Sequence, residues 1–252
     1  MASLGTSGRE PVAHRVTCVS STGVSAPIAT LAYLDEAGHQ MPVHVWHFPA
    51  PALAIASGPL GGGLGVRAWV LNATVDKAYA RLDSGVHLTE IAQALHLAGP
   101  GVGMLTAVDV RDSVAASDGG AHVVATVGLG HPTWASAPDG DLRRVRPSWP
   151  GTINIAAWIP VALSEAALVN AASTATEAKI QALWAHGVEA TGTATDAVCV
   201  ACVPFEGSGH EPEKFGGPRS VWGGRLARAV HAAVLDGTRK WLGRDDDGPS
   251  RS

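Results

Sequence analysis

The pattern of hydrophobic and polar positions divides the chain into a first half of short strands and a second half that mixes strands with helices. β-Branched or alternating apolar runs between turn residues predict strands, and apolar residues recurring every three or four positions predict helices. The strands are predicted at residues 14–19, 27–34, 41–48, 52–57, 67–75, 103–110, 121–130, 150–160 and 197–203. The helices are predicted at residues 76–85, 87–99, 165–173, 175–186 and 221–235.

Turn and capping residues mark several boundaries of these elements. Residues 35–40, DEAGHQ, read as a turn between two strands, and Ser164 is a good N-cap. Gly99 and Gly187 are predicted to end helices. Because the spacing in the first half is typical of hairpins, we expect an α+β fold, a single domain of mixed β-sheet layered with about five helices. The domain is placed at residues 13–243, with flexible tails at 1–12 and 244–252.

Composition narrows the function classes. The 252 residues are 46% hydrophobic and 16% charged, with a formal net charge of -4, which argues against a nucleic-acid partner. No apolar run reaches about 18 residues, so we expect no membrane association. The N-terminal residues lack a signal-peptide core, and the three cysteines are too few for a disulfide framework. We therefore expect a cytoplasmic protein and leave a homo-oligomer open.

Three short motifs contain residue types that can bind a ligand or a metal or take part in catalysis. The glycine run at residues 58–65, GPLGGGLG, matches neither a Walker loop nor a dinucleotide fingerprint, but its N–H groups could face an anion or oxyanion. Ser57 lies just before this run, at the end of a predicted strand. It could form the turn, or it could be a nucleophile. His44 and His47 would point to opposite faces of a strand, so we expect no shared metal. Cys199 and Cys202 lie within an apolar strand, which favours buried core thiols over a redox pair.

The best candidate site lies around residues 175–196, where two polar groups flank apolar elements. At the expected start of a helix, Thr176 and Lys179 share a face, with Glu177 beside them. On the extended approach to the following strand, Thr191, Thr193 and Thr195 share a face and Asp196 follows. Hydroxyls beside a carboxylate and an ammonium can form a nucleophile or water site. The alternative is capping and turn chemistry, with Thr174 or Thr176 as an N-cap and Asp196 as a turn residue.

Several blocks of sequence in order carry a family resemblance. PGTINI, ATEAKIQAL and GTATDAV, preceded by GGGLGVRAWVLNATV, GVGMLTAVDV and ATVGLG and followed by GRLARAVHAAV, resemble the adenosylcobinamide amidohydrolases, the CbiZ family. The likeness covers roughly residues 57–235. It implies a corrinoid-salvage hydrolase that cleaves the aminopropanol amide of adenosylcobinamide, giving adenosylcobyric acid and 1-aminopropan-2-ol. The adenosylated corrinoid is then the substrate, and no cofactor is expected.

The resemblance directs the candidate residues toward amide hydrolysis. The candidate nucleophile is the hydroxyl of Thr193 or Thr195. Alternatively, Glu177 or Asp196 activates a water molecule. Lys179 is a candidate acid, base or electrostatic group. Candidates for substrate contacts, including backbone N–H donors, are Ser57, Gly61, Gly62, Gly63, Asn72, Thr106, Asp109, Thr152, Asn154 and Thr176. Candidate walls for a corrin ring are Trp46, Trp69, Trp134, Trp149 and Trp158.

Alternatives to this function stay open. PGTINI, the helices after it and GTATDAV are also similar to self-processing amidohydrolases related to aminopeptidase DmpA, which use an N-terminal Ser or Thr. The chain could instead be a non-catalytic corrinoid-binding module, against which Glu177, Lys179 and Asp196 together argue. It could also be an amidohydrolase acting on a different linear amide.

Overall fold

A computed structural model describes residues 25–36, 38–138, 151–206 and 211–246. Its strands are β1 (Ile28–Glu36), β2 (His39–Ala56), β3 (Gly63–Thr74), β4 (Gly101–Thr106), β5 (Val114–Asp118), β6 (Ala121–Val127), β7 (Ile153–Ile159) and β8 (Ala197–Cys202). Its helices are α1 (Ser84–Ala94), α3 (Glu165–Ala185), α4 (Val221–Asp246) and the short 3-10 helix η1 (Val110–Asp112). No helix among these residues is long and apolar enough to span a membrane.

The strands described form one mixed sheet in the order β4-β3-β2-β8-β7-β6-β5, with β1 also paired to β2. The β3–β4 and β7–β8 pairs are parallel, and the remaining pairs are antiparallel. The first half of β2 pairs with β1 and its second half pairs with β8, so both neighbours lie along one edge of the same strand.

The strand β2 joins the two halves of the sheet. Its pairing with β3 shifts in register between His47 and Ala52. Pro49 and Pro51 fall within this interval, and proline cannot donate a ladder hydrogen bond. The sequence predicts two strands here, at residues 41–48 and 52–57. The prolines instead bend one 18-residue strand without ending it.

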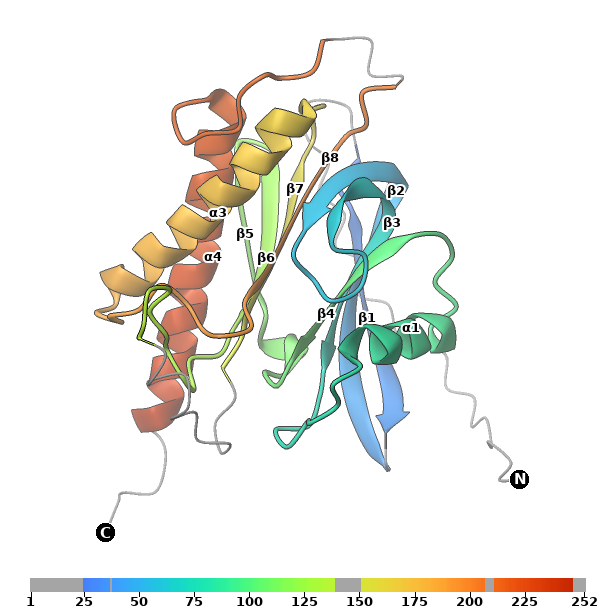
Figure 1. Ribbon diagram of the computed structural model, residues 1–252, viewed down its shortest axis with the longest axis vertical. Helices are drawn as coiled ribbons and strands as arrows, with labels where there is room; N and C mark the ends of the chain where they lie inside the picture. The colour runs from blue at the N-terminus through green and yellow to red at the C-terminus, as the bar shows by residue number, and fades with distance from the viewer. Residues whose placement is uncertain (1–24, 37, 139–150, 207–210, 247–252) are drawn as a thin grey trace.

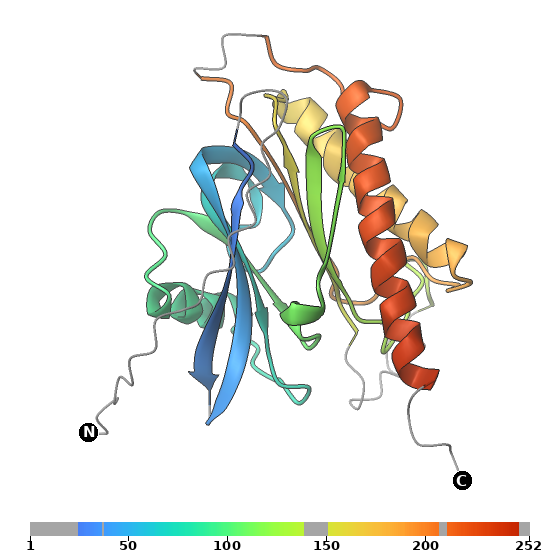
Figure 2. The same ribbon diagram turned by 180° about the vertical axis from the view of Figure 1, so that it is seen from behind.

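The helices cover the outer faces of the two halves (Figures 1 and 2). Helices α3 and α4 pack on β5 to β8, and α1 packs on β2 and β3. A third apolar cluster lies between the inner faces, with Phe48 and Val70 from one half and Ala156 and Trp158 from the other. Every residue of β7 is buried, which explains why all of them except Asn154 are apolar. The order of layers is therefore helix pair, half-sheet, half-sheet and α1, and the predicted α+β class is confirmed.

Amide side chains tie the two half-sheets together across this inner layer. Asn154 Nδ2 of β7 donates to Asn72 Oδ1 of β3 at 2.8 Å and to the Leu105 carbonyl of β4 at 2.9 Å. Asn72 Nδ2 donates to Thr126 Oγ1 of β6 at 3.0 Å. Since buried polar groups are costly unless paired, this network fixes how the half-sheets face each other.

Three helix predictions need correction. Residues 76–83 form turns and bends rather than a helix, because Asp76 closes a turn by accepting the N–H of Ala78 on its carboxylate and that of Tyr79 on its carbonyl, while residues 84 and 85 already belong to α1. Helix α1 ends at Ala94 with His96 at a positive φ of 53°, so Gly99 is not its cap. The described residues contain three α-helices rather than about five, partly because 165–173 and 175–186 are one helix.

The threonines of α3 explain why the two predicted helices, 165–173 and 175–186, form one helix. The Thr174 hydroxyl donates to the Gly216 carbonyl, and the Thr176 hydroxyl donates to the Ala172 carbonyl, so neither caps a new helix. The predicted start at Ser164 is confirmed by its side-chain hydrogen bond from Ala167 N. Gly187, at φ 71°, follows the last turn as predicted.

Further boundaries also differ from the predicted ones. The predicted strand at 103–110 ends at Thr106, because Asp109 caps η1 through Arg111 N, and β5 was not predicted. Helix α4 continues to Asp246 instead of ending at residue 235. The predicted strand at 14–19 lies outside the described residues.

We expect the two core thiols to be unreactive in the native protein. Burial raises the pKa of Cys199 to about 12 and that of Cys202 to about 11, so little reactive thiolate exists at pH 8. In a Cys18→Ser variant, Ellman's reagent should label neither thiol until guanidinium is added, and then both. The free energy of unfolding should also fall as the pH rises from about 9 toward these values, because the unfolded thiols ionise first. Rapid labelling of the native variant would contradict the burial.

We expect Asn154→Ala to destabilise the fold by about 2–3 kcal/mol, because it leaves buried partners on β3 and β4 unpaired. Urea unfolding followed by circular dichroism measures this. Asn170→Ala is the matched control, since Asn170 is exposed on α3 and should change stability by less than about 0.5 kcal/mol. Equal effects of the two changes would mean that the inner network contributes little.

Candidate active site

The carboxylate of Asp196 is the centre of the candidate site. It lies just before β8, and each oxygen accepts two hydrogen bonds. Asp196 Oδ1 accepts from the Thr193 hydroxyl at 2.5 Å and from Ile153 N at 2.9 Å. Asp196 Oδ2 accepts from Lys179 Nζ at 2.5 Å and from Thr193 N at 3.1 Å. One side chain therefore connects α3, the start of β7 and the approach to β8.

The cation that pairs with Asp196 comes from the middle of α3. The side chains of Lys179 and Asp196 are only 7% and 10% exposed. Buried charges of this kind are retained when they are paired and hydrogen-bonded, as here. Lys179 was expected at a helix start, but the continuity of α3 places it inside the helix on the face toward the sheet.

The absence of a side chain at Gly192 leaves room for the ion pair between Lys179 and Asp196. Its φ is 154°, and a Cβ at this position would lie 2.1 Å from Asp196 Oδ2 and 2.5 Å from Lys179 Nζ. Any side chain would therefore push the two charges apart. Gly192 was not singled out from the sequence, although its place between Thr191 and Thr193, four residues before Asp196, was a signal that the backbone approaches another group closely.

The hydroxyls of Thr193 and Thr195 meet at one backbone carbonyl. Thr193 Oγ1 lies 2.9 Å and Thr195 Oγ1 lies 3.3 Å from Gly151 O. Thr195 Oγ1 is also 2.6 Å from the hydroxyl of Thr152, another predicted contact residue. Of the two candidate nucleophiles, Thr193 donates a hydrogen bond to Asp196, and Thr195 is the more exposed. The Gly151 carbonyl was missed, because sequence patterns do not reveal backbone acceptors.

Three other residues of the predicted group lie apart from this cluster. Glu177 is exposed on α3, while Lys179 two positions later is buried, because residues two apart do not share a helix face. The Thr176 hydroxyl is bonded within its own helix. Thr191 does not join Thr193 either, since its hydroxyl accepts from Ala135 N at 2.8 Å and donates to Thr133 O.

The glycine loop is packed against neighbouring backbone. Leu60 and Gly103 exchange backbone hydrogen bonds, and the Gly61 carbonyl accepts from the Arg67 guanidinium. Gly61 and Gly63 have positive φ values of 66° and 86°, and a Cβ on Gly62 would lie 2.8 Å from the Gly58 carbonyl. Ser57 extends the β2–β8 pairing, exchanging bonds with Val198 through its N–H and hydroxyl. These contacts define the loop conformation, and a substrate role for Ser57 and the glycines stays a prediction.

The remaining predicted contact residues are engaged elsewhere in the fold. Asn72 and Asn154 belong to the inner network, and both N–H groups of Asn154 are used there. Thr106 is buried and accepts from Val108 N, and Asp109 binds Arg111. None of these bonds joins them to the Asp196 cluster, so their role in substrate binding also stays a prediction.

Histidines and cysteines of the predicted motifs are separated by strand alternation. His44 lines a cavity of about 20 Å³ between the half-sheets, where burial lowers its pKa, and His47 contacts Thr30. Cys199 faces the inner layer and Cys202 faces α3 and α4, so they are core thiols as expected. Among the described residues, no group of three His, Cys, Asp or Glu side chains is placed to hold an ion.

The tryptophans divide into core and surface residues. Trp46, Trp69 and Trp158 are buried, so they pack the core and do not form an open wall. Trp149 lies outside the described residues. Trp134 is 42% exposed and contacts Trp184 of α3, which is 55% exposed and was not among the predicted wall residues.

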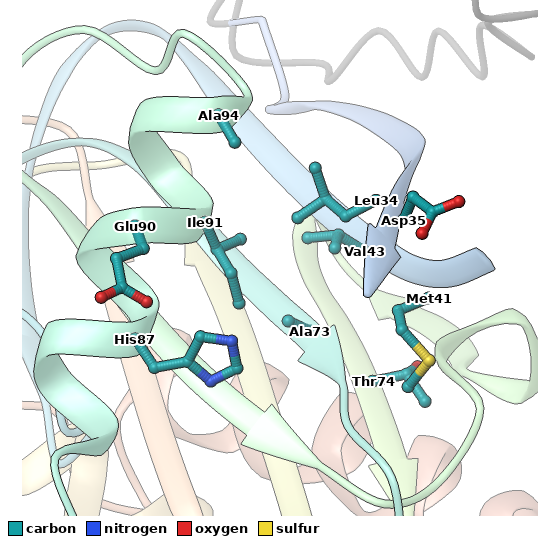
Figure 3. A pocket seen from close by; sticks show the side chains of 10 residues that line it. All are labelled: Leu34, Asp35, Met41, Val43, Ala73, Thr74, His87, Glu90, Ile91 and Ala94. Carbon is teal, nitrogen blue, oxygen red and sulfur yellow. The ribbon is translucent and has the colours of Figure 1, made fainter. Parts of the chain in front are cut away.

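A separate pocket of about 180 Å³ lies between α1 and the first three strands (Figure 3). Its floor is apolar, with Val43 and Ile91 facing each other, and Asp35, His87 and Glu90 line it as well. It shares no residue with the Asp196 cluster and borders the other half-sheet.

A hydroxyl hydrogen-bonded to a carboxylate that a third group orients has the geometry of a nucleophile beside a base, which is compatible with a hydrolase. The comparison with known families gives a family of hydrolases. Residues 25–246 match the adenosylcobinamide amidohydrolase family, CbiZ, and the chain belongs to that family.

Individual relatives are more distant. A protein of Halobacterium salinarum named adenosylcobinamide amidohydrolase is 36% identical over 133 residues, which are 52% of this chain and 55% of that protein. The match thus spans about half the length of this relative. Among solved structures, the PH0078 protein from Pyrococcus horikoshii OT3 aligns over 88% of both chains, with 13% identity and a TM-score of 0.44.

We expect Lys179→Met to destabilise the protein by about 3–5 kcal/mol, because it leaves the Asp196 carboxylate buried without its cation. Urea unfolding measures the loss. Lys240→Met, at an exposed position of α4, is the matched control and should have little effect. Adding Asp196→Asn to Lys179→Met should recover part of the stability. A loss no larger than that of the control would show that the pair is not held in a buried state.

Proposed function

We propose that the protein is an amidohydrolase of corrinoid salvage that hydrolyses the aminopropanol amide of adenosylcobinamide. The products are adenosylcobyric acid and 1-aminopropan-2-ol. Membership of the family and the name of the relative from Halobacterium salinarum support the substrate. The chain of contacts Thr193–Asp196–Lys179 supports the reaction type and is the observation that carries the proposal.

In the proposed mechanism, Thr193 is the nucleophile and Asp196 is the general base. Asp196 Oδ1 takes the hydroxyl proton while Thr193 Oγ1 bonds to the amide carbon. The C–N bond then breaks, and the protonated Asp196 returns the proton to the departing amine. Water attacks the resulting ester, giving a proton to Asp196 as it does so. The ester C–O bond breaks, and the proton returns to Thr193, so one water is consumed for each amide cleaved.

The other members of the cluster have supporting roles in this mechanism. Lys179 is a positioning residue, because its ammonium is buried against Asp196 Oδ2 and fixes which carboxylate oxygen faces Thr193. Thr195 and Thr152 form a hydroxyl pair beside Thr193 around the Gly151 carbonyl. They can orient the amide or the attacking water. Thr193 is favoured over Thr195 as nucleophile, because its hydroxyl reaches the carboxylate directly.

The test is turnover of adenosylcobinamide, with both products followed by chromatography and mass spectrometry. Thr193→Ala should lower kcat by about 10³-fold or more, because the nucleophile is lost. Thr193→Ser should keep part of the activity. Thr89→Ala is the matched control, since its hydroxyl is bonded to the Gly85 carbonyl within α1, and it should stay near the wild-type rate.

Distinct outcomes would overturn different parts of this proposal. Near-normal turnover by Thr193→Ala, with Thr195→Ala inactive, would move the nucleophile to Thr195. Near-normal turnover by both variants would favour a water activated by Asp196. A wild-type protein that binds the corrinoid without cleaving it would overturn the enzymatic function. One that neither binds nor cleaves it would overturn the substrate.

A further inference from the structure

Two indole rings meet at the surface of the molecule. The centroids of Trp134 and Trp184 are 5.7 Å apart, and the ring planes are inclined by 77°. Both are substantially exposed, whereas the buried indoles of Trp46, Trp69 and Trp158 belong to the core. Scattered apolar residues are normal on a surface, but paired exposed indoles are typical of a binding surface.

The segments that carry these indoles are held in place by hydrogen bonds. Trp184 Nε1 donates to the Ala190 carbonyl at 3.2 Å, which fixes the ring over the chain that follows α3. The segment before Trp134 is fixed through Thr133, whose carbonyl accepts from Thr191 N at 3.1 Å and whose N–H donates to the Gly192 carbonyl at 2.8 Å. The indoles are therefore oriented before any ligand arrives, which lowers the entropy cost of binding.

The same segments lead directly to the Asp196 cluster. Gly192, which is bonded to Thr133, is the residue whose backbone lies against Asp196 Oδ2 and Lys179 Nζ. Thr193 is the next residue along the chain. In Figure 1 the loop after β6 lies beside the C-terminal end of α3, where the two indoles meet. The exposed pair is thus connected, through Thr133 and Gly192, to the backbone of the residue proposed as the nucleophile.

We propose that Trp134 and Trp184 form the surface that binds the corrin ring of the substrate. This inference rests on the proposed function. A corrin is a broad ring with apolar faces and a rim of amide side chains. The near-perpendicular indoles form a corner, so that one indole contacts the ring face while the other contacts its rim. A ring seated there presents a rim amide to the neighbouring Thr193.

The test compares Trp134→Ala/Trp184→Ala with wild type, using adenosylcobinamide for turnover and adenosylcobyric acid for binding by equilibrium dialysis. The double variant should bind the corrinoid at least tenfold more weakly and raise KM by a similar factor. The kcat should stay within about threefold, since the Thr193 cluster is untouched. Replacing both residues with Phe should restore most of the binding, because an aromatic face is retained.

Controls separate a binding role from folding and assembly. Phe215→Ala removes another exposed aromatic side chain, at a position 73% exposed, and should leave corrinoid binding unchanged. Thermal unfolding should show that the double variant is folded. Sedimentation should show the same mass for it as for wild type, since a changed mass with unchanged corrinoid binding would make the indoles a contact between chains.

The outcomes distinguish this inference from the proposed function. Wild-type turnover with an unchanged KM in the double variant would overturn the inference alone. Binding without turnover in wild type, lost in the double variant, would overturn the enzymatic function and support the binding surface. No binding of either corrinoid by wild type would overturn both.

Discussion

The arrangement of the candidate site depends on one buried carboxylate that must be fully paired. Asp196 satisfies this requirement with an ammonium from α3, the backbone of β7 and the backbone and hydroxyl of Thr193. Because an unpaired charge in this position would cost several kcal/mol, helix, sheet and loop are held in a fixed relation. The Thr193 hydroxyl is positioned by these contacts, because both its hydroxyl and its backbone N–H bond to the Asp196 carboxylate.

Much of the fold could be predicted where local patterns and tertiary packing agree. Most strands of the sheet, although not β5, and the start of α3 at Ser164 follow from periodicity and capping. Sequence patterns mispredict an element where the same residues are compatible with two local structures. Pro49 and Pro51 are compatible with a strand end as well as with a bulge, and only pairing with β8 on the far side selects one long strand. Asp76 likewise forms a turn where its neighbours permit a helix.

The candidate site shows the same division between local and distant information. Lys179, Thr193, Thr195 and Asp196 were predicted from residue type and proximity in the sequence, and the structure brings them together. Glu177 was included by proximity alone and points to solvent. The Gly151 carbonyl, the space left by Gly192 and the contact of Trp184 with Trp134 arise from segments distant in sequence, so no local pattern contains them.

The continuity of α3 has a consequence for how this protein can change. Lys179 and Trp184 are separated by about 7.5 Å along one helix axis, and that helix has no break between them. The helix therefore fixes the distance and the relative orientation of the ion pair and the surface indole. A single residue inserted between them would turn the indole by about 100° around the axis. Variation in ligand size is consequently easier to accommodate in the segment that carries Trp134 than in the helix itself.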